Sequence, residues 1–227
     1  MSVHTTTDHT PRPNSLYDIG MTSDTNPIVS LVEFTYKKSV EIFGENVPAE
    51  YVYQVKKGAV RTYKLLSDGR RQIAAFHLPG DIFGLENGAT YRSTAEAIIE
   101  TTVLLIKRQS LETVAESDAV VIRSLLTATT KSLQHVENHL LLLGRKDAVE
   151  KVAAFLLEMD ERLSGAGSVT LPMSRRDIAD YLGLSLETVS RLLSQLRRAG
   201  ALDFVGTTHR ELKLLDRKQL LAFNLRD

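Results

Sequence analysis

SRRDIADYLGLSLETVSRLLSQLRRAG, residues 174–200, predicts two short helices joined by a tight turn. Ser174 is of a type that caps helix N-termini, and Asp177 three positions later can complete a capping box and place a negative charge at the positive helix end. The first helix is expected over residues 175–182. Gly183 follows it, where a left-handed backbone costs least. Ser185 then caps a second helix, expected over residues 186–199.

The second helix has two different faces. Its apolar residues recur at helical spacing and predict a buried face: Val189, Leu192, Leu193 and Leu196. The opposite face is polar and carries Glu187, Ser190, Arg191, Ser194 and Arg198. A helix of this kind suits insertion into a DNA major groove. An ordinary helical hairpin with a solvated polar face is the commoner alternative, and these residues alone leave it open.

Length and charge limit the possible classes. The 227 residues can form one large domain or two smaller ones, and the composition is that of a soluble globular protein. The formal net charge is zero, so the whole chain has no general attraction for polyanions. Residues 171–227 contain ten Lys and Arg against seven Asp and Glu, which is modest support for contact with nucleic acid.

The chain contains no cysteine, which excludes disulfides, thiolate metal sites and iron–sulfur clusters held by cysteine. No apolar run is long enough to span a bilayer, and the polar N-terminus lacks the apolar core of a signal peptide. We therefore expect a cytoplasmic protein with no membrane contact. Residues 1–24 are rich in Thr, Ser, Asp, His and Pro and predict a flexible leader.

Residues 34–108 predict a β domain. Three segments are rich in β-branched and aromatic residues and are separated by turn-forming residues: 34–43, 51–78 and 94–108. Asp68-Gly69 predicts the tip of a hairpin, Lys57-Gly58 a second turn, and residues 78–81 a corner. Several short strands at this spacing favour a sandwich or barrel.

Two functions of such a β domain compete with DNA binding. A cupin-like metal enzyme needs several ligands around one point, and the strand region has a single histidine, His77. We therefore expect no metal, no cofactor and no catalytic residues. A phosphate could instead be held near residues 84–86 by Arg92-Ser93 and backbone N–H groups. An ordinary surface loop is the favoured interpretation of these residues.

From about Asp118 the apolar period changes to that of a long helix. The separations alternate between four and three residues, which is a heptad seam over about three heptads: Ile122, Leu126, Thr129, Leu133, Val136, Leu140 and Leu143. So narrow a stripe favours pairing with the same helix of a second copy. Packing of the helix on its own β domain is the alternative.

The C-terminal part predicts a winged helix-turn-helix. Asp147 can cap a helix that precedes the two short helices. Residues 202–205 and 211–215 are short strand candidates on either side of a hairpin tip at residues 206–210. A last short helix is expected over residues 217–225.

This order of parts resembles the CRP/FNR family of bacterial transcription regulators over most of the chain from about residue 30. LSLETVSR, residues 184–191, is similar to the LGLTxETVSR recognition segment of the family. DAVEKVAAFLLEM, residues 147–159, resembles the opening of its DNA-binding domain. Four further segments resemble the sensory β-roll of the family: YQV at 53–55, GAVR at 58–61, FHLPGD at 76–81 and Phe83-Gly84. The sequence of this region is most similar to that of the FixK branch.

The chain departs from other branches of that family. It has no N-terminal cysteine cluster for an iron–sulfur sensor. The cyclic-nucleotide branch has a longer phosphate cassette that begins with Gly-Glu, whereas here Gly84 precedes Leu85 and only seven residues separate it from Arg92. The resemblance therefore implies a FixK-like protein that is regulated mainly by its own supply. A ligand-gated, CRP-like sensor remains the alternative.

The resemblance implies an α+β fold in four parts: a flexible leader (1–24), an antiparallel β-roll of jelly-roll, cyclic-nucleotide-binding type (25–116), a dimerisation helix (117–144) and a winged helix-turn-helix (145–227). It implies a homodimeric transcription regulator, an activator that contacts RNA polymerase and binds a palindrome like TTGAT-N4-ATCAA.

The resemblance also assigns roles to residues of the helix pair. Base contacts fall to Leu186, Glu187, Ser190 and Arg191, although Leu186 could instead be a core residue. Four residues lie at the two helix N-termini, where phosphate contacts are expected, and each could equally be only a cap: Ser174, Arg175, Ser185 and Thr188. Weaker phosphate candidates are Arg197, Arg198 and Arg210.

Overall fold

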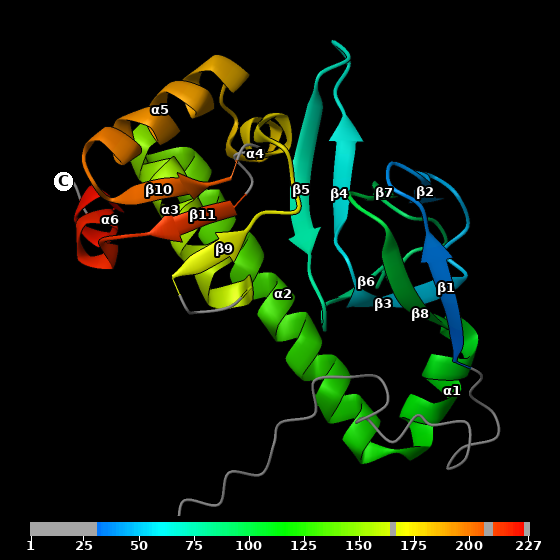
Figure 1. The fold of residues 1–227 in the computed structure, drawn as a ribbon. Coiled ribbons are helices and arrows are strands. Elements are labelled where there is room, and N and C mark those ends of the chain that lie inside the picture. Colours follow the sequence, from blue (N-terminus) through cyan, green and yellow to red (C-terminus); the bar gives the residue numbers. More distant parts are fainter. Residues whose placement is uncertain (1–30, 164–166, 207–210, 225–227) are drawn as a thin grey trace, which may run out of the picture.

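The computed structural model describes residues 31–163, 167–206 and 211–224, which form a β-roll, a long connecting helix and a C-terminal helical domain with a small sheet (Figure 1). The predicted leader, residues 1–24, lies outside the described residues. So do residues 25–30 of the predicted β-roll domain, the predicted wing residue Arg210 with most of the hairpin tip, and the last three residues of the chain.

The β-roll consists of two four-stranded antiparallel sheets. One sheet has the order β1 (Val32–Tyr36), β8 (Thr101–Lys107), β3 (Tyr51–Lys57) and β6 (Ile82–Phe83). The other has the order β2 (Glu41–Phe43), β7 (Thr94–Ala97), β4 (Val60–Leu65) and β5 (Arg71–His77). Their inner faces enclose an apolar core that includes Phe43, Tyr53, Val60, Tyr91 and Val103. The predicted β-roll is confirmed.

The predicted turns lie where the sequence placed them. Gly58 between β3 and β4, Gly69 at the tip of the β4–β5 hairpin and Gly80 before β6 all have positive φ angles. A Cβ atom on Gly58 would lie 2.5 Å from Thr101 Oγ1 and 2.6 Å from the Glu100 carbonyl oxygen, so this turn also requires glycine for space.

Two helices follow the β-roll. Helix α1 (Arg108–Ser117) was not predicted, because Lys107 at its N-cap makes no side-chain cap and no glycine or proline marks its start. It packs on the β-roll through Leu111 and Val114. Helix α2 (Ala119–Arg145) is the predicted long helix. Its buried Val121 contacts the core beneath α1, and the half-buried Leu142 packs on the C-terminal core.

The C-terminal domain has the predicted winged helix-turn-helix order. It comprises α3 (Ala148–Leu163), β9 (Ser168–Thr170), α4 (Arg175–Leu182), α5 (Leu186–Arg198), β10 (Leu202–Val205), β11 (Glu211–Leu214) and α6 (Arg217–Asn224). The strands form a sheet in the order β10-β11-β9. Asp147 caps α3 as predicted, since its Oδ1 accepts hydrogen bonds from the N–H groups of Val149 and Glu150, each at 2.9 Å.

One apolar core joins the β-roll to the C-terminal domain. Phe76 of β5 lies 5.1 Å, between ring centroids, from Tyr181 of α4, and Phe155 of α3 lies 5.8 Å from the same tyrosine. Figure 1 shows α4 beside β5, with the β4–β5 hairpin extending past it. The two halves of the described chain are therefore packed on each other as well as linked by α2. Among the described residues, no helix is both long and apolar enough to cross a membrane.

Candidate nucleic-acid interface

Helix α4 begins with the predicted capping box. The Ser174 hydroxyl oxygen accepts a hydrogen bond from the Asp177 backbone N–H at 3.2 Å, and Asp177 Oδ2 accepts from the Ser174 N–H at 2.9 Å. The helix ends at Gly183, which has the left-handed φ of 64° that the sequence predicted. These two signals fix both ends of the helix that supports α5.

Helix α5 begins one residue after Ser185, whose hydroxyl accepts a hydrogen bond from the Thr188 N–H at 3.1 Å. Ser174 and Ser185 therefore both act as caps in this structure. The apolar face predicted for α5 is buried as expected, and its members are Val189, Leu192, Leu193 and Leu196. That burial turns the opposite face of the helix outward.

The outward side of α5 contains the four predicted base-contact residues, which we call the recognition face: Leu186, Glu187, Ser190 and Arg191. Glu187 and Arg191 are exposed, while Leu186 and Ser190 are half-buried. Hydrogen bonds from its own backbone N–H and from the Ser185 hydroxyl lower the pKa of Glu187, which keeps this carboxylate ionised. In the part of the chain that the structure describes, Arg191 forms no ion pair. The face thus presents one acceptor group and one forked donor to solvent.

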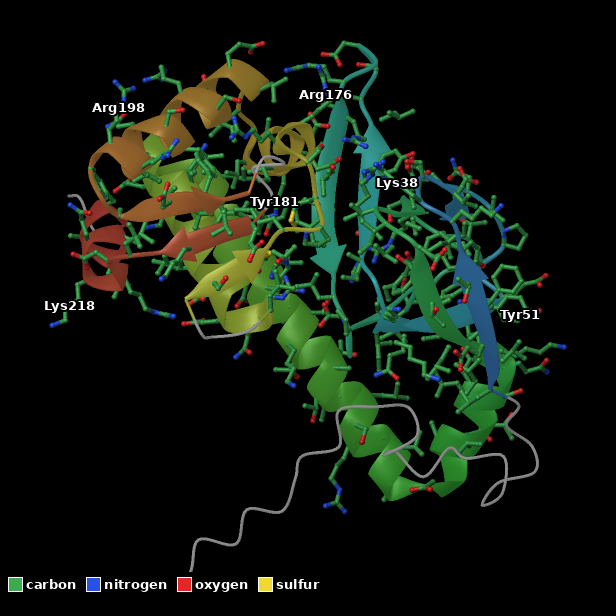
Figure 2. The ribbon with its side chains drawn as sticks, viewed as in Figure 1. Lys38, Tyr51, Arg176, Tyr181, Arg198 and Lys218 are labelled. Carbon is green, nitrogen blue, oxygen red and sulfur yellow. The ribbon has the colours of Figure 1, made fainter. Side chains whose placement is uncertain are left out.

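The other arginines of this region differ in whether their guanidinium groups already have partners within the protein. Arg175, predicted at a phosphate position, lies over the ring of Phe204 at 5.3 Å, and Arg197 lies over the same ring and pairs with Asp203 at 2.8 Å. Arg198 is exposed at the far end of α5 (Figure 2). Sequence reasoning missed Arg176, which is exposed on the first turn of α4 beside β5 (Figure 2). The sequence signal that could have identified Arg176 is its place between the two capping-box residues, Ser174 and Asp177, at the N-terminus of the helix.

The loop that could have held a phosphate is engaged within the protein. Arg92 Nε pairs with Glu86 Oε2 at 2.6 Å, and the Arg92 backbone N–H donates to the same carboxylate at 3.2 Å. Tyr91 next to it stacks on Phe43 with 3.7 Å between ring centroids, and its hydroxyl donates to the Tyr51 carbonyl at 2.7 Å. Aromatic side chains therefore fill the β-roll behind this loop.

A second surface lies along α2. Five apolar residues of the predicted heptad seam are between 48% and 69% exposed: Ile122, Leu126, Leu133, Val136 and Leu140. Thr129 is exposed between them. Leu143, the last predicted member, is half-buried. Its Cδ2 atom lies 3.7 Å from the point where a Cβ atom on Gly183 would be, so it packs beside the turn between α4 and α5. We call the five exposed residues the α2 stripe.

No metal centre is apparent among the described residues, since they contain no group of three or more His, Asp or Glu side chains placed to hold an ion. His77 lies alone in this respect. Its Nε2 shares a hydrogen bond with Thr62 Oγ1 at 3.1 Å, and its ring stacks on Phe83 with 5.0 Å between centroids. His77 is a packed side chain within the β-roll.

Comparison with known proteins agrees with this geometry. Residues 150–223 match the Crp-like helix-turn-helix domain, and residues 33–118 match the cyclic nucleotide-binding domain. The nitrogen fixation regulation protein FixK of Rhizobium meliloti is 46% identical over 163 residues, which cover 72% of this chain and 74% of that protein. The chain belongs to the CRP/FNR family of transcription regulators. As a member of that family it is a DNA-binding regulator of the FixK type.

Solved structures of the CRP/FNR family confirm the fold. The structure of FixK2 from Bradyrhizobium japonicum superposes with a TM-score of 0.83 at 60% identity and covers 87% of this chain and 99% of that one. TTHB099, a CRP-family regulator from Thermus thermophilus, has a TM-score of 0.70 at 27% identity and covers 84% of this chain and 96% of that one. The α+β fold and the FixK resemblance expected from the sequence are therefore confirmed.

Proposed function

We propose that this regulator is a homodimeric transcription activator that binds a palindrome like TTGAT-N4-ATCAA through α5. The observation that carries the proposal is the recognition face, which is outward and polar while the opposite side of the same helix is buried. Two copies of α5 related by a two-fold axis would enter successive major grooves about one helical turn apart. The half-site sequence is an expectation from the family resemblance.

Each member of the recognition face has a chemical partner at base edges. The Arg191 guanidinium suits the O6 and N7 acceptors of one guanine, and the ionised Glu187 suits the N4 amine of a cytosine. Ser190 and Leu186 suit thymine, with the apolar side chain against the methyl group. The half-burial of Leu186 fits both a methyl contact and the partial core role that its spacing allowed.

Phosphate contacts fall to the N-termini of α4 and α5. Free backbone N–H groups and the helix dipoles favour anions there, and we add the exposed Arg176 to the predicted residues Ser174, Arg175, Ser185 and Thr188. Because Arg175 and Arg197 lie on Phe204, we rank them below Arg176.

The α2 stripe supports dimerisation. A helix rises about 1.5 Å per residue, so the stripe from Ile122 to Leu140 extends over about 27 Å of one helix side. Apolar residues exposed at heptad spacing over that length are typical of a two-helix seam. Leu133→Glu should therefore shift the protein to monomers in analytical ultracentrifugation. Gln134→Glu adds the same charge at the next position, off the stripe, and should leave the dimer intact.

Activation is supported by relatives that carry this role in their names. One is the transcriptional activator protein anr of Pseudomonas aeruginosa, which is 32% identical over 82% of this chain and 78% of that protein. RNA polymerase is accordingly the further partner we propose.

Selection of bound duplexes from random DNA tests the proposal directly. We expect enrichment of a palindrome whose half-sites resemble TTGAT and lie about one helical turn apart. Recovery of unrelated sequences without two-fold symmetry would contradict both the half-site and the dimer.

Cyclic-nucleotide sensing is the second candidate, because residues 33–118 match the cyclic nucleotide-binding domain. The Arg92–Glu86 pair and the stacked Tyr91 argue against it. Calorimetric titration with cyclic AMP and cyclic GMP separates the two candidates. We expect no saturable heat, and saturable binding would establish the sensor.

A further inference from the structure

The β4–β5 hairpin of the β-roll holds α4 by ion pairs. Arg61 Nη1 lies 3.0 Å from Asp177 Oδ1, and Arg71 Nη2 lies 2.6 Å from the same oxygen and 2.7 Å from Asp180 Oδ2. Arg71 Nε donates to Asp180 as well, at 2.9 Å. On its other side Arg61 is held by Glu96 of the neighbouring strand at 2.5 Å. Two arginines of the β-roll thus form ion pairs with α4 of the C-terminal domain.

These contacts lie in a largely enclosed place. The exposed fractions of the side chains are 12% for Arg61, 19% for Arg71 and 5% for Asp177. Pairs so enclosed are screened little by salt, and loss of one partner leaves the other charge poorly solvated. Arg61 Nε is buried without a hydrogen-bond partner among the described residues, so the carboxylates are what compensates for the burial of this guanidinium.

Asp177 serves the cap and the ion pairs at the same time. Its Oδ2 accepts from the backbone N–H and the hydroxyl of Ser174, at 2.9 Å and 2.7 Å, while its Oδ1 faces the two arginines. Burial opposes its ionisation, but the Ser174 hydrogen bonds and the two guanidinium groups outweigh that effect and lower the pKa of Asp177. The first turn of α4 is therefore fixed by the β-roll.

The position of α4 determines that of α5. Ile178 and Leu182 of α4 are buried in one core with Val189 and Leu193 of α5, and the turn between the helices is closed by a hydrogen bond from the Leu184 N–H to the Ala179 carbonyl. A close-packed pair of this kind moves as a unit. Whatever orients α4 against β5 also orients the recognition face.

We propose that Arg61 and Arg71 are positioning residues for DNA recognition, which act from the β-roll through Asp177 and Asp180 to hold α5 in its outward orientation. The inference rests on the proposed function. It gives the β-roll a fixed mechanical role, which fits its filled aromatic interior. The orientation of α5 is then held by ion pairs within the chain.

A distance measurement tests the ion pairs without DNA. The chain has no cysteine, so Lys38→Cys in the β-roll and Lys218→Cys in α6 give two defined sites for spin labels; both lysines are exposed and far apart (Figure 2). Labelled protein is diluted into an excess of unlabelled protein to suppress distances between copies. We expect one narrow distance distribution, and a clearly broader one after Arg71→Asp.

A charge exchange separates positioning from simple stabilisation. Asp180 takes no part in the capping box, so Arg71→Asp combined with Asp180→Arg restores an ion pair and leaves the cap in place. We expect Arg71→Asp to weaken binding to the selected operator by about tenfold or more. The exchanged pair should recover part of that loss, because the pair between positions 71 and 180 is restored while the contact of Arg71 with Asp177 is not. Arg70→Asp is the matched control, because Arg70 is 77% exposed and pairs with Asp68 inside the hairpin tip.

The outcomes distinguish the two proposals. A narrow distribution and unchanged operator affinity in Arg71→Asp would overturn the positioning role, and so would a broadened distribution with unchanged affinity. Equal losses in Arg71→Asp and in the exchanged pair would also overturn it. If the parent binds no palindrome, the DNA proposal fails by itself, and the distance distributions still decide whether the ion pairs fix the domains.

Discussion

Charged residues of the helix pair fall into two groups that the structure separates by burial. Asp177 and Asp180 are engaged with Arg61 and Arg71 inside the molecule. Glu187 and Arg191, one turn apart on α5, point outward. The first group holds α4 in its orientation within the fold. The second group is free to form hydrogen bonds with a partner of complementary pattern.

Replacement of Arg191 by Ala should remove one base contact. We expect a loss of about 1–3 kcal/mol in binding to the specific duplex and relaxed preference at one base pair, because a bidentate pair with guanine is lost. Fluorescence anisotropy with the selected operator and its single-base variants measures both effects. Arg198→Ala, at the other end of α5, should weaken binding without changing base preference. Equal affinity of Arg191→Ala and the parent would remove Arg191 from the recognition face.

Acid should destabilise the β-roll through His77. Burial, supported by the nearby Arg162 and opposed by Asp81, lowers the pKa of His77 to about 4. The unfolded chain, with an ordinary histidine, takes up a proton near pH 6.5, so the stability contribution of neutral His77 is present above that pH and is lost as pH falls towards 4. Urea unfolding at pH 7.5 and pH 5 should show a smaller pH effect in His77→Gln than in the parent. An identical pH effect in both proteins would refute the assignment.

Turns and helix ends carry most of the local information in this chain. The hairpin at Asp68-Gly69, the Gly183 helix end and the Asp147 cap all lie at positions marked by residue type alone. Helix α1 lacks such marks, and its formation depends on Leu111 and Val114 packing against the β-roll. Elements stabilised by local chemistry were therefore predictable, whereas an element stabilised mainly by its contacts was not.

Two glycines with similar backbones should respond differently to alanine. A Cβ atom added at Gly69 would have no neighbour within 4 Å. Gly69→Ala should therefore lower the free energy of unfolding only by the strain of a left-handed backbone, about 1–2 kcal/mol. Gly58→Ala adds a collision with the Thr101 hydroxyl and the Glu100 carbonyl, which should cost about 1–3 kcal/mol more. Urea unfolding of the two variants measures the difference. Equal losses would show that the β3–β4 turn relaxes freely.

At the scale of the whole molecule the β-roll and the C-terminal domain share one core. Phe76, Phe155 and Tyr181 meet at the boundary, and His139 of α2 stacks on Tyr181 with 4.0 Å between ring centroids. Domains joined only by a helix would move freely, whereas domains with a buried apolar boundary tend to behave as one unit.

The shared core predicts cooperative unfolding. We expect amide hydrogen exchange to report one common opening free energy for the central amides of β4 and α4, because unfolding of either side breaks the apolar cluster that joins the two domains. Tyr181→Ala removes the ring at the boundary and should split this behaviour, with α4 opening at lower free energy than β4. Separate opening of the two elements in the parent would contradict a single unit.

The sequence by itself determined the order of the main parts, the capped helix pair and the heptad spacing of α2, because each depends on residues that are neighbours in the chain or repeat at a fixed period. Its short motifs also carried the resemblance to the family. Only the tertiary structure decided that Arg92 is paired with Glu86, that Leu143 packs within the chain and that Arg61 and Arg71 hold α4. Arg61 and Arg71 lie more than a hundred residues from Asp177 in the sequence, and no periodicity connects them with it. Ion pairs across domains become visible only when the fold brings their partners within a few ångströms.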